Sequence, residues 1–224
     1  MTMMCRVVIS LVMILLSAPL IHGQDLSKYR NFSFGMSLLE LSKQIDSQPL
    51  HTKLIHKRPA VIQELTWWPR DSSDSSLQAD SLRQIFFSFY NGELCKILVT
   101  YDRQATQGLT AEDMIQAISA KYGTATRPDA QISFPTNELY RSTEKVIARW
   151  EDSQYSINLF RSSLLNSFGL VMFSKGLDGQ AEAAISESVK LEGREDLQKE
   201  SERQKKEADN LEVARQKNRN TFHP

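Results

Sequence analysis

The chain has 224 residues, and its 27 basic residues balance its 27 acidic ones. A chain with no basic surplus has no electrostatic basis for binding nucleic acid. The two cysteines, Cys5 and Cys95, are too few for a fold built on disulfides, so stability must come from a hydrophobic core.

The first 23 residues have the layout of an export signal. Arg6 is the only charge, the apolar run 7–16 follows it, and small residues lead to a predicted cleavage between Gly23 and Gln24. The alternative is a membrane anchor, which needs about 20 continuous apolar residues, and Pro19 interrupts this run too early. We therefore expect residues 1–23 to be removed and the mature chain to be periplasmic or secreted.

A capped helix start occurs twice in the mature chain. Ser37 is followed three residues later by Glu40, and Thr110 is followed in the same way by Asp113. This spacing predicts a capping box, in which the hydroxyl accepts from the N3 amide and the carboxylate accepts from the cap amide. Apolar residues at helical spacing follow each cap, so each predicts a short helix that needs a sheet to pack on.

Segments rich in β-branched and aromatic residues follow each helix. Six of them are predicted strands: 60–68, 82–90, 94–101, 145–151, 154–161 and 168–175. Asn91-Gly92 predicts a type I′ hairpin turn, because both central positions of that turn need positive φ. Apolar and polar residues alternate along most of these strands, which predicts a sheet with one buried face covered by the helices.

These elements predict an α+β fold made of two tandem units, 32–103 and 106–177. In each unit, short helices pack on an antiparallel β-meander. A unit of about 70 residues is marginal alone, so we expect the two sheets to join edge to edge or to pack against each other.

The C-terminal part, residues 180–224, is predicted to be a charged helical or partly disordered tail. Twelve of the eighteen residues 192–209 are charged. Glu195 and Lys199 have the i, i+4 spacing that supports a solvated helix, and fraying is expected from Arg215. No sustained apolar seam for a coiled coil is present in the sequence.

The two helix starts also carry a family resemblance. Gly35-Met36-Ser37 with Glu40, followed by a β-meander that contains tryptophan, resembles the outer-membrane assembly lipoprotein BamE (the SmpA/OmlA family). Two such units in tandem also resemble the β-lactamase inhibitor protein. The resemblance covers most of residues 33–177 and implies a non-enzymatic module that binds other proteins. It extends neither to the lipid-attachment cysteine of BamE nor to the cysteine pairs of the inhibitor.

Few residues have a pattern that suggests chemistry. The five-residue gap between His51 and His56 puts them on different faces of a helix and on opposite faces of a strand, so a metal site there would need ligands from elsewhere. With Lys53, Lys57 and Arg58 they form a local basic patch, which is interpreted as solvated surface. We predict no catalytic residue, no metal ligand and no cofactor.

Three further motifs have interpretations other than a catalytic or metal site. Cys95, Ile97 and Val99 occupy every second position of one predicted strand and so share a face, which predicts a buried core cysteine rather than a nucleophile. Residues 71–80 contain aspartates but lack the glycine and the final glutamate of a calcium-binding loop, and a polar loop is predicted. Asn31 is in a glycosylation sequon, which matters only in a host that glycosylates.

The predicted interaction surface is built on tryptophans: Trp67, Trp68 with Arg70 beside it, and Trp150. Adjacent tryptophans on a strand point to opposite faces, so we expect one of Trp67 and Trp68 in the core and one exposed. An exposed tryptophan is a common interface anchor, whereas packing under a loop or on the other unit is the alternative.

The function predicted from these features is an exported, non-catalytic protein-binding module of the cell envelope or periplasm. Its predicted partner is another envelope or secreted protein, with no nucleic acid and no membrane span after cleavage. Two alternatives remain open: a small-molecule or lipid binder that uses the groove between helices and sheet, and an enzyme with an unrecognised site.

Overall fold

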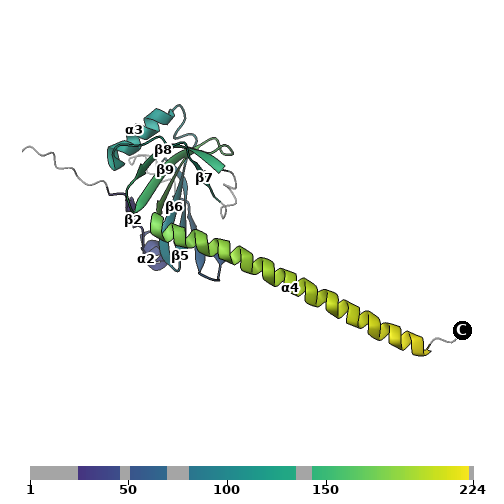
Figure 1. The fold of residues 1–224 in the computed structure, drawn as a ribbon. Coiled ribbons are helices and arrows are strands. Elements are labelled where there is room, and N and C mark those ends of the chain that lie inside the picture. Colours follow the sequence, from purple (N-terminus) through teal and green to yellow (C-terminus); the bar gives the residue numbers. More distant parts are fainter. Residues whose placement is uncertain (1–24, 46–50, 70–80, 135–142, 222–224) are drawn as a thin grey trace, which may run out of the picture.

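The computed structural model describes residues 25–45, 51–69, 81–134 and 143–221. Its body is a mixed α+β arrangement around one large antiparallel sheet (Figure 1). Along that sheet the order is β3-β4-β5-β6-β10-β9-β8-β7. The strands are β3 (His51–His56), β4 (Ile62–Trp67), β5 (Leu82–Tyr90), β6 (Glu93–Tyr101), β7 (Gln131–Ser133), β8 (Thr143–Glu151), β9 (Tyr155–Arg161) and β10 (Phe168–Ser174).

The remaining elements of the described residues are one small sheet and three helices. The two-stranded sheet pairs β1 (Lys28–Tyr29) with β2 (Phe32–Ser33). The helices are α2 (Leu38–Gln44), α3 (Ala111–Tyr122) and α4 (Lys175–Thr221). The sequence predicted α2 and α3 and the six longest central strands, but it missed the two edge strands β3 and β7. Because β3 is rich in polar and basic residues and β7 has only 3 residues, neither carries a strand pattern.

The two halves of the chain meet edge to edge within the large sheet. Residues of β3–β6 form one four-stranded half and residues of β7–β10 form the other, and β6 pairs with β10 at their junction. The register of this pair runs from Gly169 opposite Thr100 to Phe173 opposite Lys96. This pairing protects one edge of each half.

The two predicted capping boxes are present. The Ser37 amide donates to Glu40 Oε2 over 2.8 Å, and the Glu40 amide donates back to Ser37 Oγ over 3.2 Å. Thr110 and Asp113 make the same two bonds over 2.8 and 3.2 Å. The hydrogen bonds from Ser37 hold the pKa of the Glu40 carboxyl below its usual range, as those from Thr110 do for Asp113.

The predicted hairpin turn between β5 and β6 has the expected backbone. Asn91 has φ 49° and Gly92 has φ 88°, which is the pair of positive values that a type I′ turn needs. The Asn91 side chain also accepts a hydrogen bond from the Val61 amide over 3.0 Å, so the turn is tied to β4.

The expectation of a single buried sheet face is wrong. One face carries the main core, against which α2, α3 and the β1–β2 pair pack. On the opposite face Phe86, Leu98 and Phe160 are buried around Phe134. Farther along that face, Ala181 and Ala184 of α4 pack on the sheet. Alternation did not reveal this second layer because its strands carry buried apolar residues in consecutive positions.

The expectation that Cys95 shares a face of the sheet with Ile97 and Val99 is also wrong. The ladder between β5 and β6 shifts register between Ser88 and Phe89, so β6 carries an extra residue there. Leu94 and Ile97 both lie in the main core, whereas Cys95 packs on the α4 side. The bulge therefore moves the thiol to the face that α4 covers.

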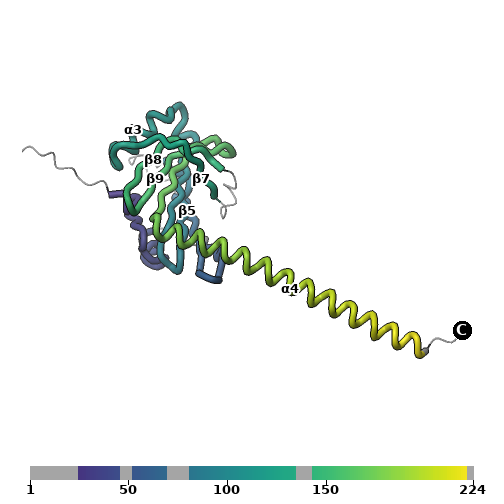
Figure 2. Tube along the Cα trace, viewed as in Figure 1, coloured from purple at the N-terminus to yellow at the C-terminus, as the bar shows by residue number. Residues whose placement is uncertain are grey.

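Helix α4 follows β10 directly and projects far beyond the body (Figures 1 and 2). Its contacts with the body extend as far as Glu195, and residues 196–220 are exposed on every side. At 1.5 Å per residue, this exposed stretch is about 37 Å long. The helix runs to Thr221, past Arg215, where fraying was expected.

Ion pairs along the exposed part of α4 differ from the predicted ones. Lys199 pairs with Asp196 rather than with Glu195, over 3.5 Å. Two further i, i+3 pairs, Arg203 with Glu200 and Arg215 with Glu212, are each 2.8 Å long. Within the described ranges, none of the helices has the length together with the apolar character that a bilayer crossing requires.

Candidate functional site

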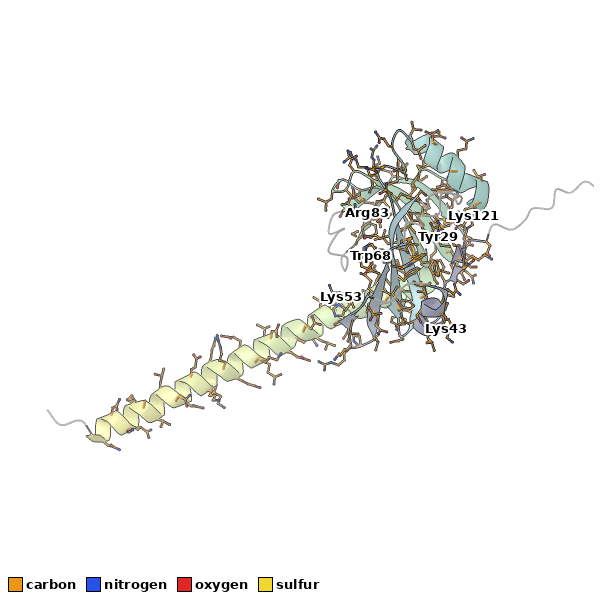
Figure 3. The ribbon with its side chains drawn as sticks, turned by 180° about the vertical axis from the view of Figure 1, so that it is seen from behind. Tyr29, Lys43, Lys53, Trp68, Arg83 and Lys121 are labelled. Atoms are coloured by element: carbon orange, nitrogen blue, oxygen red, sulfur yellow. The ribbon has the colours of Figure 1, made fainter. Side chains whose placement is uncertain are left out.

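The adjacent tryptophans at the end of β4 lie on opposite sides of the sheet. Trp67 packs edge-on against Phe32 in the main core, with ring centroids 5.8 Å apart. Trp68 is 47% exposed, and Figure 3 shows it at the surface of the body. One of the two therefore packs on the core, where it is partly buried, and the other is exposed, as the alternation along the strand predicts.

A hydrogen bond fixes the orientation of Trp68. Its indole Nε1–H donates to Oε1 of Gln84 over 3.0 Å, and Gln84 itself is buried on β5. This partner was missed by the sequence analysis, because it is on another strand and its own position depends on strand register. The result is an aromatic side chain held with part of its ring exposed, which loses little rotamer freedom on binding.

Trp150 does not belong to the surface where the sequence analysis placed it. It is 1% exposed, and its indole Nε1–H lies 3.1 Å from Ser119 Oγ and 2.9 Å from the Gly123 carbonyl oxygen. These two acceptors are at the C-terminal end of α3. Trp150 therefore ties α3 to β8 as a core residue. Arg70 and the aspartates of 71–80 lie outside the described residues.

The contact between α4 and the sheet contains a small charged cluster that the sequence did not indicate. Lys96 Nζ lies 2.8 Å from Asp178 and 3.1 Å from Glu182, one helical turn farther along α4. Burial raises the pKa of Asp178. Burial opposes the charge of Lys96 as well, but the two carboxylates outweigh it and raise the pKa of the ammonium. Lys96 thus stays charged and holds α4 against β6.

Cys95 lies beside this cluster and is a structural residue. It is 2% exposed and its thiol donates to the Ser88 carbonyl oxygen over 3.1 Å. Burial raises the pKa of the Cys95 thiol to about 12, and the Asp178 carboxylate adds to the rise. A thiol that is not ionised at neutral pH is a poor nucleophile. The prediction of a buried cysteine is confirmed.

A histidine, a serine and a glutamate also meet at the α4 contact. His56 Nδ1 lies 2.8 Å from Ser188 Oγ and 3.3 Å from Glu192 Oε1. In a serine–histidine–acid relay the serine and the acid contact different ring nitrogens, whereas both contact Nδ1 here. The three side chains instead fasten β3 to α4, together with the 2.8 Å ion pair between Arg58 and Glu195.

The basic patch predicted around His56 is therefore not wholly solvated, because part of it docks on acidic residues of α4. For His51 only the backbone is described. Among the residues that the structure describes, no three His, Cys, Asp or Glu side chains are grouped so that they could hold a metal ion.

The groove between α4 and the sheet offers little room. Its cavity has a volume of about 40 Å³ and is lined mainly by apolar side chains, with Lys96 and Asp178 at one side. This is space for a few water molecules, well below the size of ordinary small-molecule pockets.

Comparisons with protein-family models, with curated proteins and with solved structures found no match. The resemblance to BamE and to the β-lactamase inhibitor protein therefore stays a prediction.

Proposed function

We propose that this protein is an exported, non-catalytic module that binds another protein of the cell envelope or periplasm. Export rests on the signal-like residues 1–23. The observation that carries the binding proposal is Trp68, a half-exposed tryptophan held in one orientation by Gln84. Tryptophan is enriched among residues that dominate binding energy, and a preoriented ring gives up less entropy when a partner covers it.

The finer fold proposal is that the body consists of two tandem units, 32–103 and 106–177. Each contains a helix that begins with a capping box, and each helix precedes four strands. The strand order β3-β4-β5-β6 in one half mirrors β7-β8-β9-β10 in the other, with β6 and β10 at the centre. The repeated order supports duplication. A run of antiparallel strands could give this strand order by itself, but it would not explain why a capped helix precedes each group of four strands.

The outer part of α4 fits a spacer in the same proposal. A helix that is polar all round and stabilised by many close ion pairs is suited to cross solvent between two bodies. Residues 196–220 are exposed and mostly polar, with Leu197, Leu211 and Val213 as the large apolar exceptions. Lys199, Arg203 and Arg215 are each paired one turn back. We infer that α4 holds the Trp68-bearing body at a distance from whatever the C-terminal end contacts.

The test is affinity capture on an envelope extract of the producing organism with the mature chain and two variants. We expect the mature chain to retain a defined partner, Trp68→Ala to lose it, and Leu39→Ala to keep it. Leu39 is the matched control because it is an exposed large apolar residue, 65% accessible on α2. Equal recovery of the partner by the Trp68→Ala variant contradicts the proposed surface.

A further inference from the structure

A pocket opens at one end of the β6–β10 junction, where the two halves of the sheet meet. It lies between the loop that follows β6 and the turn that joins β9 to β10, and its volume is about 430 Å³. Because Gly169 pairs with Thr100 in the sheet, the start of β10 and the end of β6 bring these two segments together. The volume is within the range of pockets that enclose small molecules.

The chemistry of the pocket wall is cationic and polar. Two arginines line it, Arg103 from the first segment and Arg161 from the second, together with the apolar Leu109 and Phe168. The polar side chains around them are Gln104, Thr106, Gln107, Asn166 and Ser167. No acidic side chain of the described residues is part of this wall.

Among the described residues, no acidic side chain compensates the charge of these two arginines. Within the described residues, no carboxylate lies within 4.0 Å of either guanidinium. Asp102 is next to Arg103 in sequence, but its carboxylate accepts from the amides of residues 104 and 105 over 2.7 and 3.0 Å. That carboxylate shapes the loop and does not line the pocket.

Both segments are held in place by internal contacts. The Arg161 guanidinium lies over the Phe168 ring, 5.3 Å from its centroid. Thr106 Oγ1 donates to the Asp102 carbonyl oxygen over 2.7 Å, and the Ser162 amide donates to the Ser167 carbonyl oxygen over 2.9 Å. A pocket built this way exists before a ligand arrives, which lowers the entropy lost on binding.

Ser167 adds an unpaired polar group beside the pocket. It is 4% exposed, and its hydroxyl is the buried side-chain polar atom that has no hydrogen-bond partner in the described structure. Leaving such a group unpaired costs about 1–3 kcal/mol. The cost disappears when an ordered water pairs with the hydroxyl.

We propose that this pocket binds the oxyanion group of a small solute, a phosphate, a sulfate or a carboxylate. Arg103 and Arg161 donate charge-assisted hydrogen bonds to it. Guanidinium groups suit this role because their planar array of donors matches two oxygens of such a group. The proposal does not depend on the proposed function, because Trp68 is not part of the pocket wall.

The test is titration calorimetry of the mature chain at constant ionic strength, with inorganic phosphate in one arm and succinate in the other. Saturable binding with a dissociation constant at or below about 1 mM is expected in at least one arm. The arm that binds tells a tetrahedral oxyanion from a carboxylate. Arg161→Gln and Arg103→Gln are each expected to weaken it about tenfold or more.

Lys43→Gln is the matched control, since it removes one exposed positive charge on α2 at another part of the body (Figure 3). It is expected to bind as the unaltered chain does. Arg103 is on a loop, so Arg103→Gln keeps the test valid even if the loss of the Arg161–Phe168 contact impairs folding. Absence of saturable binding in both arms, or equal binding by Arg103→Gln, overturns the proposal.

Discussion

Trp150 and Trp68 show that the same residue type has different structural roles in the two halves of the sheet. Trp150 is enclosed on β8 and donates to two acceptors at the end of α3. Trp68 follows β4, donates to one buried glutamine and keeps about half of its surface accessible. The contrast teaches that a hydrogen-bonded indole can be either a clamp within the core or a partly exposed group, which we propose anchors a partner, and that exposure separates the two.

Truncating the two tryptophans should affect stability very differently. We expect Trp150→Ala to lower the free energy of unfolding by about 3–5 kcal/mol, because it empties a closed part of the core. Trp68→Ala is expected to cost about 1 kcal/mol, chiefly through the unpaired Gln84. Chemical denaturation measures both, and Trp150→Phe is the control that keeps most of the ring. An equal loss in the two alanine variants contradicts the assignment of Trp150 as the clamp.

Alkaline pH tests another buried group, the thiol of Cys95. Burial raises the folded-state pKa of Cys95 from 9.0 to about 12, so the thiolate forms first in the unfolded chain. The free energy of unfolding is therefore constant below pH 9 with respect to this group. It falls by up to about 1.4 kcal/mol per pH unit above pH 9, as the pH rises toward the folded pKa.

Denaturation midpoints measured between pH 8 and pH 10, in the unaltered chain and in Cys95→Ala, check this expectation. Burial also raises the pKa of Tyr101 well above its usual value, so part of the alkaline loss remains in the variant. A pH dependence that Cys95→Ala leaves unchanged would show that the thiol is not the titrating group.

Removing the outer part of α4 is expected to have the smallest effect. A chain that ends after Glu195 keeps the Arg58–Glu195 pair and all contacts between α4 and the sheet. Because residues 196–220 are exposed throughout, the denaturation midpoint of the body should stay the same while the helical circular-dichroism signal decreases. A lower midpoint would mean that the outer helix contacts the body, which contradicts the spacer role.

Local signals explain what the sequence predicted correctly. The capping boxes at Ser37 and Thr110 and the Asn91-Gly92 turn are set by residues at most three positions apart. The opposite orientations of Trp67 and Trp68 follow from the pleat of any strand. These features needed no knowledge of the partners across the sheet.

Long-range packing explains what the sequence did not reveal. Whether Trp150 is buried depends on where α3 ends, and the displaced thiol of Cys95 depends on a register shift in the pairing of β5 with β6. The pocket combines Arg103 and Arg161 from two segments that meet only because β6 pairs with β10. The residue pattern of one strand does not indicate which other strand it pairs with.

The most direct test of the binding proposal is the affinity of the purified partner, once captured, for the Trp68→Ala and Leu39→Ala variants. Titration calorimetry should show Trp68→Ala weakened by about 30-fold or more, as for an interface hot spot. It should also show Leu39→Ala unchanged. Equal affinities of the Trp68→Ala variant and the unaltered chain would contradict the claim that this tryptophan anchors the interface.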